Sequence, residues 1–361
     1  MPILSAIARS SCVGLLWLAI GGGANASGQV CPPAPEFARP GAKAASSLAI
    51  RDYKPVFEIC RDPAFGAKIA IRRMSVNGAA YFLTVDPQTL ATRIEAEACF
   101  ACAPTTDAAQ QSTRYLAAIA AASLPPKAQP AGRRYLRNAG LVHGEGEGAF
   151  VTGELCPSRL PLDRGFFEKL EATGRGAPVA LSISGLWLQR HTADFQWLRE
   201  HARSGALKIT WVNHSFHHPY EIGRPLESNF LLGAGVAMQA EIMETEKLLI
   251  ANGETPSVFF RFPGLISNPA LMETLRANHL IALGADGWLA YGAKLRPGAV
   301  VLVHPNGNEP VGLRMFSRRL DEKGLPMPLR ALNEAPAASA QPAASGACPA
   351  DDGCPRSGDP N

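Results

Sequence analysis

The chain has 361 residues, 47% of them hydrophobic and 18% charged, which allows a sizeable buried core and excludes a wholly disordered protein. Its formal net charge is only +4, and because there is no long Lys/Arg run we expect no nucleic-acid partner. The 34 glycines and 30 prolines exceed what a compact helical bundle needs and indicate many turns or linker segments.

The N-terminus is typical of a cleavable secretory signal peptide over residues 1–26. Arg9 precedes an apolar stretch at residues 12–20 (CVGLLWLAI), and residues 24–26 (ANA) match a cleavage site. The stretch is much shorter than the roughly 20 apolar residues that a membrane-spanning helix needs. We therefore predict a periplasmic or secreted protein with no integral membrane segment after cleavage, and a flexible Pro/Ala/Gly-rich segment at residues 27–45.

Cleavage would leave seven of the eight cysteines in an oxidising compartment, where disulfides form. Cys99 and Cys102 form a C-x-x-C pair that suits a zinc knuckle, a redox pair, or a local or crossed structural disulfide. We favour the disulfide, because no second C-x-x-C completes a four-cysteine zinc site. Cys348 and Cys354 can pair with each other. An odd number leaves one thiol over, and Cys156 is the candidate.

Residues 46–122 are predicted to form a small Cys-containing, β-rich module. Residues 68–74 (KIAIRRM) alternate apolar and polar side chains as a half-buried strand does, and residues 79–85 (AAYFLTV) are the returning strand. The Asn77-Gly78 dipeptide between them predicts a hairpin turn. Residues 123–147 combine proline, glycine and mixed charge, which is typical of a linker.

Residues 148–333 change character, because short apolar strands alternate with helical stretches. This pattern predicts an α/β fold with a parallel sheet or barrel, in which functional groups gather at the C-terminal ends of the strands. Predicted strands lie at 150–152, 179–184, 207–212, 257–261, 280–283 and 299–304, and predicted helices at 163–172, 192–203, 236–251 and 269–278. Residues 334–361 are rich in Ala, Pro, Ser and Gly and are predicted to be a disordered tail.

Histidines follow the predicted strand at 207–212. His214 and His218, in the stretch HSFHHP, are four residues apart, so in a turn or helical start both imidazoles can face one divalent metal ion. A polar loop with incidental histidines is the alternative. We favour a metal site, because three histidines within five positions at a strand end are unusual.

Other predicted strand ends also carry polar side chains. Arg261 begins RFPG, Asp286 and Trp288 follow the strand at 280–283, and His304 begins HPNGNEP. Each alone has a structural explanation, as a surface charge, a turn cap or a core residue. Together they predict one site at the C-terminal edge of the sheet.

The order H-S-x-x-H-P, R-x-P-G, D-x-W and L-V-H resembles the polysaccharide deacetylase (NodB homology) family over about residues 148–320. The resemblance implies a distorted (β/α) barrel that binds one divalent metal ion, with zinc expected, and removes acetyl groups from a glycan. It also implies that His214 and His218 are metal ligands. The remaining implied roles fall on five residues: His304 (general acid), Asp286 (holding and tuning His304), Arg261 (orienting the base), and Trp288 and Pro263 (substrate contact).

The first motif departs from that family, in which T-F-D-D-G-P supplies a base and a metal ligand. Residues 152–157 (TGELCP) align Glu154 with the first aspartate and Leu155 with the second. Leucine cannot bind a metal ion, so two histidines remain as matched ligands, one fewer than the three protein ligands usual at a catalytic zinc site. Glu154 is therefore either the base or a metal ligand, and cannot easily be both.

We expect an exported, metal-dependent hydrolase that removes acetyl groups from a glycan, either an N-acetyl amide or an O-acetyl ester. Peptidoglycan or an exopolysaccharide is the expected substrate. The alternative prompted by Leu155 is a catalytically decayed, carbohydrate-binding protein. A third possibility is a structural or assembly module that acts through the N-terminal region. Metal content separates the first two.

Overall fold

The computed structural model describes residues 48–62, 66–126 and 132–337. By its internal contacts the chain divides after Val30, and all described residues belong to the second unit, residues 31–361. The predicted signal peptide, the segment at 27–45, nearly all of the predicted tail, and the Cys348–Cys354 pair lie outside the described residues. In the described ranges, no helix has the length and apolar character that crossing a membrane requires.

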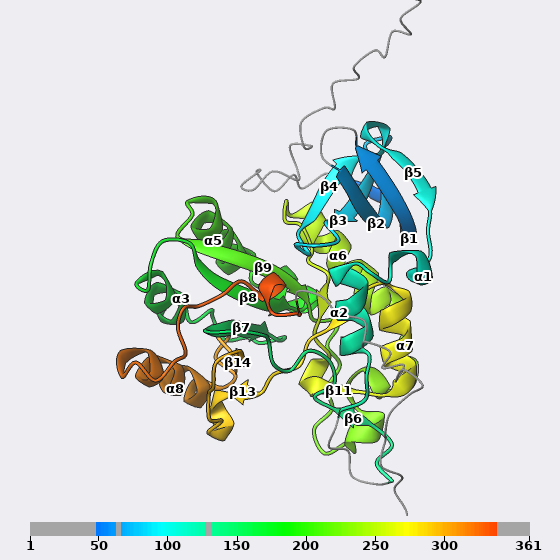
Figure 1. Ribbon diagram of the computed structural model, residues 1–361. Helices are drawn as coiled ribbons and strands as arrows, with labels where there is room; N and C mark the ends of the chain where they lie inside the picture. Colours follow the sequence, from blue (N-terminus) through cyan, green and yellow to red (C-terminus); the bar gives the residue numbers. More distant parts are fainter. Residues whose placement is uncertain (1–47, 63–65, 127–131, 338–361) are drawn as a thin grey trace, which may run out of the picture. The chain divides into compact units, whose positions relative to one another are not determined.

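The N-terminal module is an antiparallel sheet of five strands in the order β4-β3-β2-β1-β5 (Figure 1). Asn77 and Gly78 join β2 to β3 with φ values of 51° and 83°, so the predicted hairpin turn is confirmed. The elements of the module are β1 (Ile50–Asp62), β2 (Gly66–Val76), β3 (Ala79–Val85), β4 (Thr92–Ala96), η2 (Glu97–Cys99), β5 (Ala101–Pro104), α1 (Asp107–Gln110) and α2 (Arg114–Ala122).

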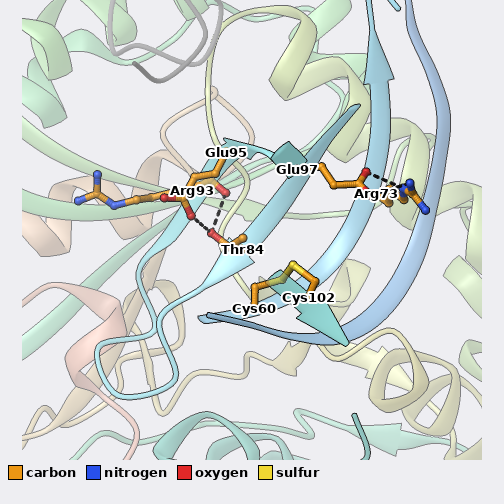
Figure 2. Close-up of a disulfide and its surroundings, with 7 residues drawn as sticks. All are labelled: Cys60, Arg73, Thr84, Arg93, Glu95, Glu97 and Cys102. Carbon is orange, nitrogen blue, oxygen red and sulfur yellow. Dashed lines mark hydrogen bonds and ion pairs between the residues drawn. A yellow bond between two sulfur atoms is a disulfide. The ribbon is translucent and has the colours of Figure 1, made fainter. Parts of the chain in front are cut away.

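A disulfide joins Cys60 of β1 to Cys102 of β5, which face each other in the strand ladder (Figure 2). The bond closes a sequence separation of 42 residues, so the predicted structural disulfide is confirmed, and of the two forms left open it is the one that joins Cys102 to a distant cysteine and not to Cys99. Figure 2 also shows the surface ion pair between Arg73 of β2 and Glu97 of η2. The disulfide ties the edge strand β5 to the sheet and restricts the unfolded chain.

The second region is built on a parallel sheet of seven strands in the order β12-β10-β9-β8-β7-β14-β13. The predicted α/β fold, a distorted barrel behind a β-rich module, is confirmed, and within the described ranges its curved sheet ends at β12 and β13. The strands are β7 (Ala149–Leu155), β8 (Ala177–Ile183), β9 (Leu207–Asn213), β10 (Phe259–Phe260), β12 (Ile281–Ala282), β13 (Gly287–Trp288) and β14 (Ala299–Val303).

Helices follow most of these strands, as the alternating pattern predicts. They are α3 (Arg164–Glu171), α4 (Gly185–Arg190), α5 (Thr192–Arg203), α6 (Met238–Ala251), α7 (Pro269–Ala277) and α8 (Pro310–Asp321), with 3-10 turns η3 (Leu226–Ser228), η4 (Phe230–Leu232), η5 (Pro263–Leu265), η6 (Leu289–Tyr291) and η7 (Leu332–Glu334). The bounds of α5 agree with the predicted helix at 192–203, whereas the predicted strand at 257–261 is only two residues long.

Alternate residues of the central strands face opposite sides of the sheet, as the two-residue period of a strand requires. In β7, Val151 and Leu155 pack in a cluster that includes Phe316 of α8. Phe150 of the same strand packs in the cluster that the sheet shares with the N-terminal module. Glu154, an even-numbered residue of β7, therefore lies on the face opposite Leu155.

The segment predicted as a linker at 123–147 is partly ordered where the structure describes it. A short strand, β6 (Leu136–Arg137), pairs antiparallel with β11 (Ile266–Ser267), and Leu141 bridges to Leu283. The start of the predicted tail also packs, because Ala335 is buried and its carbonyl accepts the N–H of Glu145. Composition did not reveal these contacts, since single backbone bridges need few apolar residues.

A buried ion pair connects the module to α6. Arg72 of β2 donates from Nε and Nη2 to the carboxylate of Glu246 at 2.7 and 3.0 Å, and both side chains are almost fully excluded from solvent. The hydroxyl of Tyr53 donates to the same carboxylate at 2.8 Å, and Nη1 of Arg72 donates to the carbonyl of Asn278 at 2.9 Å. These bonds satisfy the buried charges and fix how β2 meets α6.

Candidate active site

Two histidines come together on the turn after β9. His214 is fully buried, and its Nδ1 donates to the carbonyl of Arg261 at 2.8 Å, which leaves Nε2 as the nitrogen that faces Cys156 and Glu154, each 3.5 Å away. His218 is held from the other side of the turn, where Ser215 Oγ accepts its backbone N–H at 3.1 Å. Both Ser215 and His218 have positive φ, 62° and 48°, so the turn is a strained one.

Glu241, in the first turn of α6, fixes this histidine turn. Its Oε2 accepts the backbone N–H groups of Phe216 and His217 at 2.8 and 2.9 Å, and its Oε1 lies 2.7 Å from Nδ1 of His217. The side chain of His217 is thereby turned to the surface, where it is 63% exposed. No sequence pattern distinguishes Glu241, because a glutamate at the start of a helix is common on structural grounds alone.

The altered first motif lies at the end of β7. Glu154 and Cys156 are buried on the site's side of the strand, whereas Leu155 is buried in the apolar cluster behind it. Cys156 Sγ lies 3.5 Å from Nε2 of His214 and 3.8 Å from Oε2 of Glu154. Among the cysteines that the structure describes, none forms a disulfide with Cys156. Glu154 and Leu155 occupy the two positions at which the motif is expected to carry acidic residues. Cys156, the next residue, is the one whose side chain points into the site with that of Glu154.

His304 lies between two carboxylates. Its Nε2 is 3.0 Å from Oε2 of Glu154, and its Nδ1 is 2.9 Å from Oε2 of Glu309. Glu309 also accepts Nε1–H of Trp288 at 3.0 and 3.1 Å. In the sequence, Glu309 can equally well be explained as a residue of the turn after His304. Only the folded structure shows that its side chain contacts His304.

The expectation that Asp286 holds His304 is corrected by these contacts. Asp286 accepts the backbone N–H of Val300 at 3.0 Å, and its other oxygen lies 2.7 Å from Nδ1 of His143. The physical reason is the register of β13 and β14, in which Gly287 pairs with Val301, so Asp286 meets the start of β14 and not its C-terminal end. Glu309 takes the place that the sequence analysis gave to Asp286.

Arg261 is a fully buried neighbour of Glu154. It donates from Nη1 to Thr152 Oγ1 at 2.7 Å and from Nη2 to the carbonyl of Gly284 at 2.8 Å. Its Nε lies 3.7 Å from Oε1 of Glu154, an ion-pair distance beyond that of a hydrogen bond. Burial lowers the pKa of Arg261 to about 10, although Glu154 and Cys156 act to raise it. The guanidinium thus remains a cation beside the carboxylate at neutral pH.

The charges of the site reinforce one another. Burial raises the pKa of Glu154, but His214 and His304 outweigh it and hold that pKa well below its ordinary value. Burial also raises the pKa of the Cys156 thiol, but the nearby histidines, His218 foremost, hold it well below its ordinary value. Burial lowers the pKa of His214, yet Glu154 and Cys156 raise it to about 9. The site therefore sets a carboxylate and a thiolate against basic imidazoles.

The pKa of His304 is also set by burial acting against nearby charged groups. Burial lowers its pKa, but Cys156, Glu154 and Glu309 together raise it well above its ordinary value. The imidazole therefore keeps its proton to a higher pH than an ordinary histidine and can donate it from the nitrogen that faces Glu154.

An open cavity of about 540 Å³ leads to these residues. Its floor includes Glu154, Cys156 and His304, and aromatic side chains line it, namely Trp288, Tyr220 and Phe230. Tyr220 is well exposed and stacks on Phe230 with ring centroids 5.1 Å apart. Trp288 thus lies where the sequence analysis placed it, whereas Pro263 is buried and its neighbour Gly264 lines the cavity instead.

The residues fit a divalent metal ion. One ligand atom each of Cys156, His214 and His218 lies within 4.8 Å of the others, and the same holds for Glu154, Cys156 and His304. Nε2 of His218 is buried and has no hydrogen-bond partner among the described residues, so it is available to a ligand. Imidazole, thiolate and carboxylate are the donors that zinc takes in proteins.

No family model matches the chain. Among solved structures it is similar to a family 4 carbohydrate esterase from Bacillus anthracis, with 15% identity and a TM-score of 0.40 over 55% of this chain and 87% of that one. A family 4 carbohydrate esterase from Streptomyces lividans in complex with acetate has 21% identity and a TM-score of 0.35 over 51% and 93%. A chitin deacetylase from Colletotrichum lindemuthianum has 12% identity and a TM-score of 0.37 over 53% and 88%. Because these values are low, we base the function on this chain's own residues.

Proposed function

We propose that the protein is an exported hydrolase that removes acetyl groups from a glycan, with peptidoglycan or an exopolysaccharide as the polymer. The observation that carries this proposal is the pairing of Glu154 with His304 on the floor of an open, aromatic-lined cavity, next to His214 and His218. Acyl transfer to water requires a general base, a general acid and an electrophile such as a metal ion, all placed around the same acyl group. The order of motifs in the sequence supports the same class of reaction.

Glu154 acts as the general base. Its neighbours hold it ionised, so it accepts the proton of the water that attacks the acyl carbon. Oε1 of Glu154 is buried without a hydrogen-bond partner in the described part of the chain, and it is therefore available to receive that proton. Arg261 lies 3.7 Å away and keeps the carboxylate charged and in place between proton transfers.

His304 acts as the general acid. Its Nδ1 is occupied by Glu309, so Nε2 is the nitrogen that donates a proton to the leaving amine or hydroxyl. Since Nε2 also contacts Glu154, a proton taken from water can return to the leaving group within this pair of residues. Glu309 is a positioning residue, because it fixes the ring and the tautomer without touching the reacting atoms.

His214 and His218 hold a divalent metal ion in this proposal, with zinc the expected metal. A bound ion would supply Lewis-acid chemistry, which polarises the acyl carbonyl. The aromatic side chains of Trp288 and Tyr220 would pack against the apolar faces of sugar rings on either side of the acetylated unit. Export is supported by the signal-like N-terminus and by the Cys60–Cys102 disulfide.

The test is acetate release from N-acetylated chito-oligomers and from an O-acetylated polysaccharide, measured before and after metal removal. We expect release that a chelator stops and zinc restores, and that His218→Ala abolishes. His201→Ala is the matched control. His201 of α5 pairs with Glu171 of α3, and it is not among the residues that line the cavity. Release that survives both the chelator and His218→Ala would overturn the metal-dependent reaction.

A second candidate is the catalytically decayed, carbohydrate-binding protein. The observation that favours it is Leu155, which stands at the second acidic position of the first motif and is buried in the core. Glycan binding without acetate release from any acetylated substrate would support this candidate against the first.

A further inference from the structure

We propose that Cys156 is the third protein ligand of the metal, so that the metal centre is a cysteine and two histidines. The inference deepens the proposed function, since it concerns the metal site on which that function rests. It assigns the missing ligand to the residue after Leu155. The observation that carries it is the convergence of three side-chain atoms, Cys156 Sγ, one nitrogen of His214 and one of His218, within 4.8 Å of one another.

Strand alternation explains why cysteine, and not the preceding residue, reaches the metal site. Leu155 ends β7 with its side chain in the apolar cluster that includes Phe316. Cys156 is one residue further on and points to the same side as Glu154. The carbonyl of Cys156 accepts Nδ2–H of Asn306 at 2.9 Å, which fixes the backbone at this point. The chain thus presents sulfur at the site although its second acidic position is a leucine.

Each of the two histidines has a ring nitrogen available to bind a metal ion together with Cys156 Sγ. Nδ1 of His214 is committed to the carbonyl of Arg261, so its Nε2, 3.5 Å from Cys156 Sγ, is the nitrogen that remains for a ligand. Within residues 48–62, 66–126 and 132–337, Nε2 of His218 is buried without a hydrogen-bond partner, and such an unpaired buried polar atom is costly unless something binds it. A metal ion bound by Cys156, His214 and one nitrogen of His218 would give all three side chains a partner.

This ligand set leaves Glu154 to do one task. With Cys156 as the third ligand, the carboxylate stays with His304 at 3.0 Å and Arg261 at 3.7 Å, where it serves as the base. Three protein ligands and one open position is the pattern of catalytic zinc sites. A thiolate ligand also selects against hard ions such as Mg²⁺, which prefer oxygen.

The experiment is metal binding to the full chain, followed by absorption spectroscopy. After removal of bound metal, Co²⁺ is titrated into the wild-type protein, into Cys156→Ser and into Cys99→Ser, the control with its substituted cysteine in the N-terminal module. We expect one Co²⁺ per chain with an intense near-ultraviolet thiolate-to-cobalt band in the wild type and in Cys99→Ser. Cys156→Ser should lack the band and bind Zn²⁺ more weakly by more than the roughly 100-fold that loss of an outer-shell partner costs.

Two results would overturn the inference. One is a wild-type cobalt spectrum without a thiolate band at full occupancy, a result that needs no variant and does not depend on how Cys156→Ser folds. The other is a covalently acylated Cys156, isolated from wild-type protein stopped during turnover, which would make the thiol a nucleophile paired with His304 instead of a ligand.

The two proposals fail separately. A thiolate band without acetate release from any acetylated glycan would sustain the cysteine ligand and refute the deacetylase. Acetate release by a cobalt-loaded protein that shows no thiolate band would sustain the deacetylase and refute the cysteine ligand.

Discussion

Nε2 of His304 lies 3.0 Å from Oε2 of Glu154, although 150 residues separate the two in the sequence. Their strands explain the contact, because β14 pairs with β7 in parallel and Val303 faces Gly153 in the register. The next residue of each strand therefore reaches the same C-terminal edge of the sheet. This pair is where a proton can pass between a carboxylate and an imidazole.

Glu154→Gln should reduce kcat for acetate release by about 10²-fold to 10⁴-fold, because an amide keeps the shape of the side chain but cannot accept the proton of water. The metal content should not change, since the three candidate ligands remain. The measurement is the rate of acetate release together with metal analysis of the same sample. Glu147→Gln, at an exposed position before β7, is the control and should retain full activity. Loss of the metal from Glu154→Gln would instead make Glu154 a ligand.

Glu309→Gln should lower kcat, whereas Asp286→Asn should leave it unchanged. Glu309 contacts Nδ1 of His304, so its loss frees the ring and should lower kcat by about 10-fold to 100-fold, part of what general acid–base catalysis contributes. Asp286 contacts His143 and Val300, so Asp286→Asn should keep kcat and change only the stability. Steady-state kinetics of both variants decides the point. A fall in kcat for Asp286→Asn alone would return the tuning role to Asp286.

Arg72→Met should lower the free energy of unfolding by about 3–5 kcal/mol, because it leaves the buried carboxylate of Glu246 without its partner. Arg73→Met, one residue along the same strand, is the matched control. Arg73 pairs with Glu97 at the surface, with side chains 44% and 30% exposed, so its loss should cost at most about 1 kcal/mol. Urea unfolding measures both. Equal costs for the two variants would contradict a special role for the buried pair.

The stability of the protein should fall below about pH 6.5 partly through His279. Burial lowers the pKa of His279 from 6.5, and Arg72 and Arg276 act in the same direction while Asp107 opposes them. In the unfolded chain the imidazole takes a proton near its ordinary pKa, but in the folded chain it does so only at lower pH. The contribution is therefore fully present above the unfolded pKa and is lost as the pH falls towards the folded one.

The substitution that isolates this contribution is His279→Phe. The ring of His279 stacks on Phe57 of β1 with centroids 3.7 Å apart, and a phenyl ring keeps the stacking without titrating. Urea unfolding at about pH 7.5 and about pH 5.5 should show a smaller loss of stability for the variant than for the wild type. An unchanged difference between the two pH values would exclude His279 as a contributor.

Much of the fold and the centre of the site could be predicted from the sequence. The alternation of strands and helices, the Asn77-Gly78 hairpin and the helix at 192–203 depend on residues close together in the chain. Local periodicity reports them because a strand buries alternate residues and a helix buries residues three and four apart. Glu154, His214, His218 and His304 could be found for a related reason, since each follows or ends a recognisable strand.

Partners that depend on how distant segments meet could not be read from the sequence. The pairing of Cys60 with Cys102, the choice of Glu309 over Asp286 at His304, and the support of the histidine turn by Glu241 all follow from strand register and loop path. Composition and periodicity carry no information on either.

The role of Cys156 could be predicted from the sequence only in part. Its alternation with Leu155 is present in the sequence, where residues 154 and 156 share a face if the strand continues. Only the folded chain shows that this face meets His214 and His218, because the turn after β9 is held there by contacts with Arg261 and Glu241. Local spacing thus indicated Glu154, His214, His218 and His304 as candidates for the chemistry, and the pairing of strands far apart in the chain established which side chains meet, Glu309 and Glu241 among them.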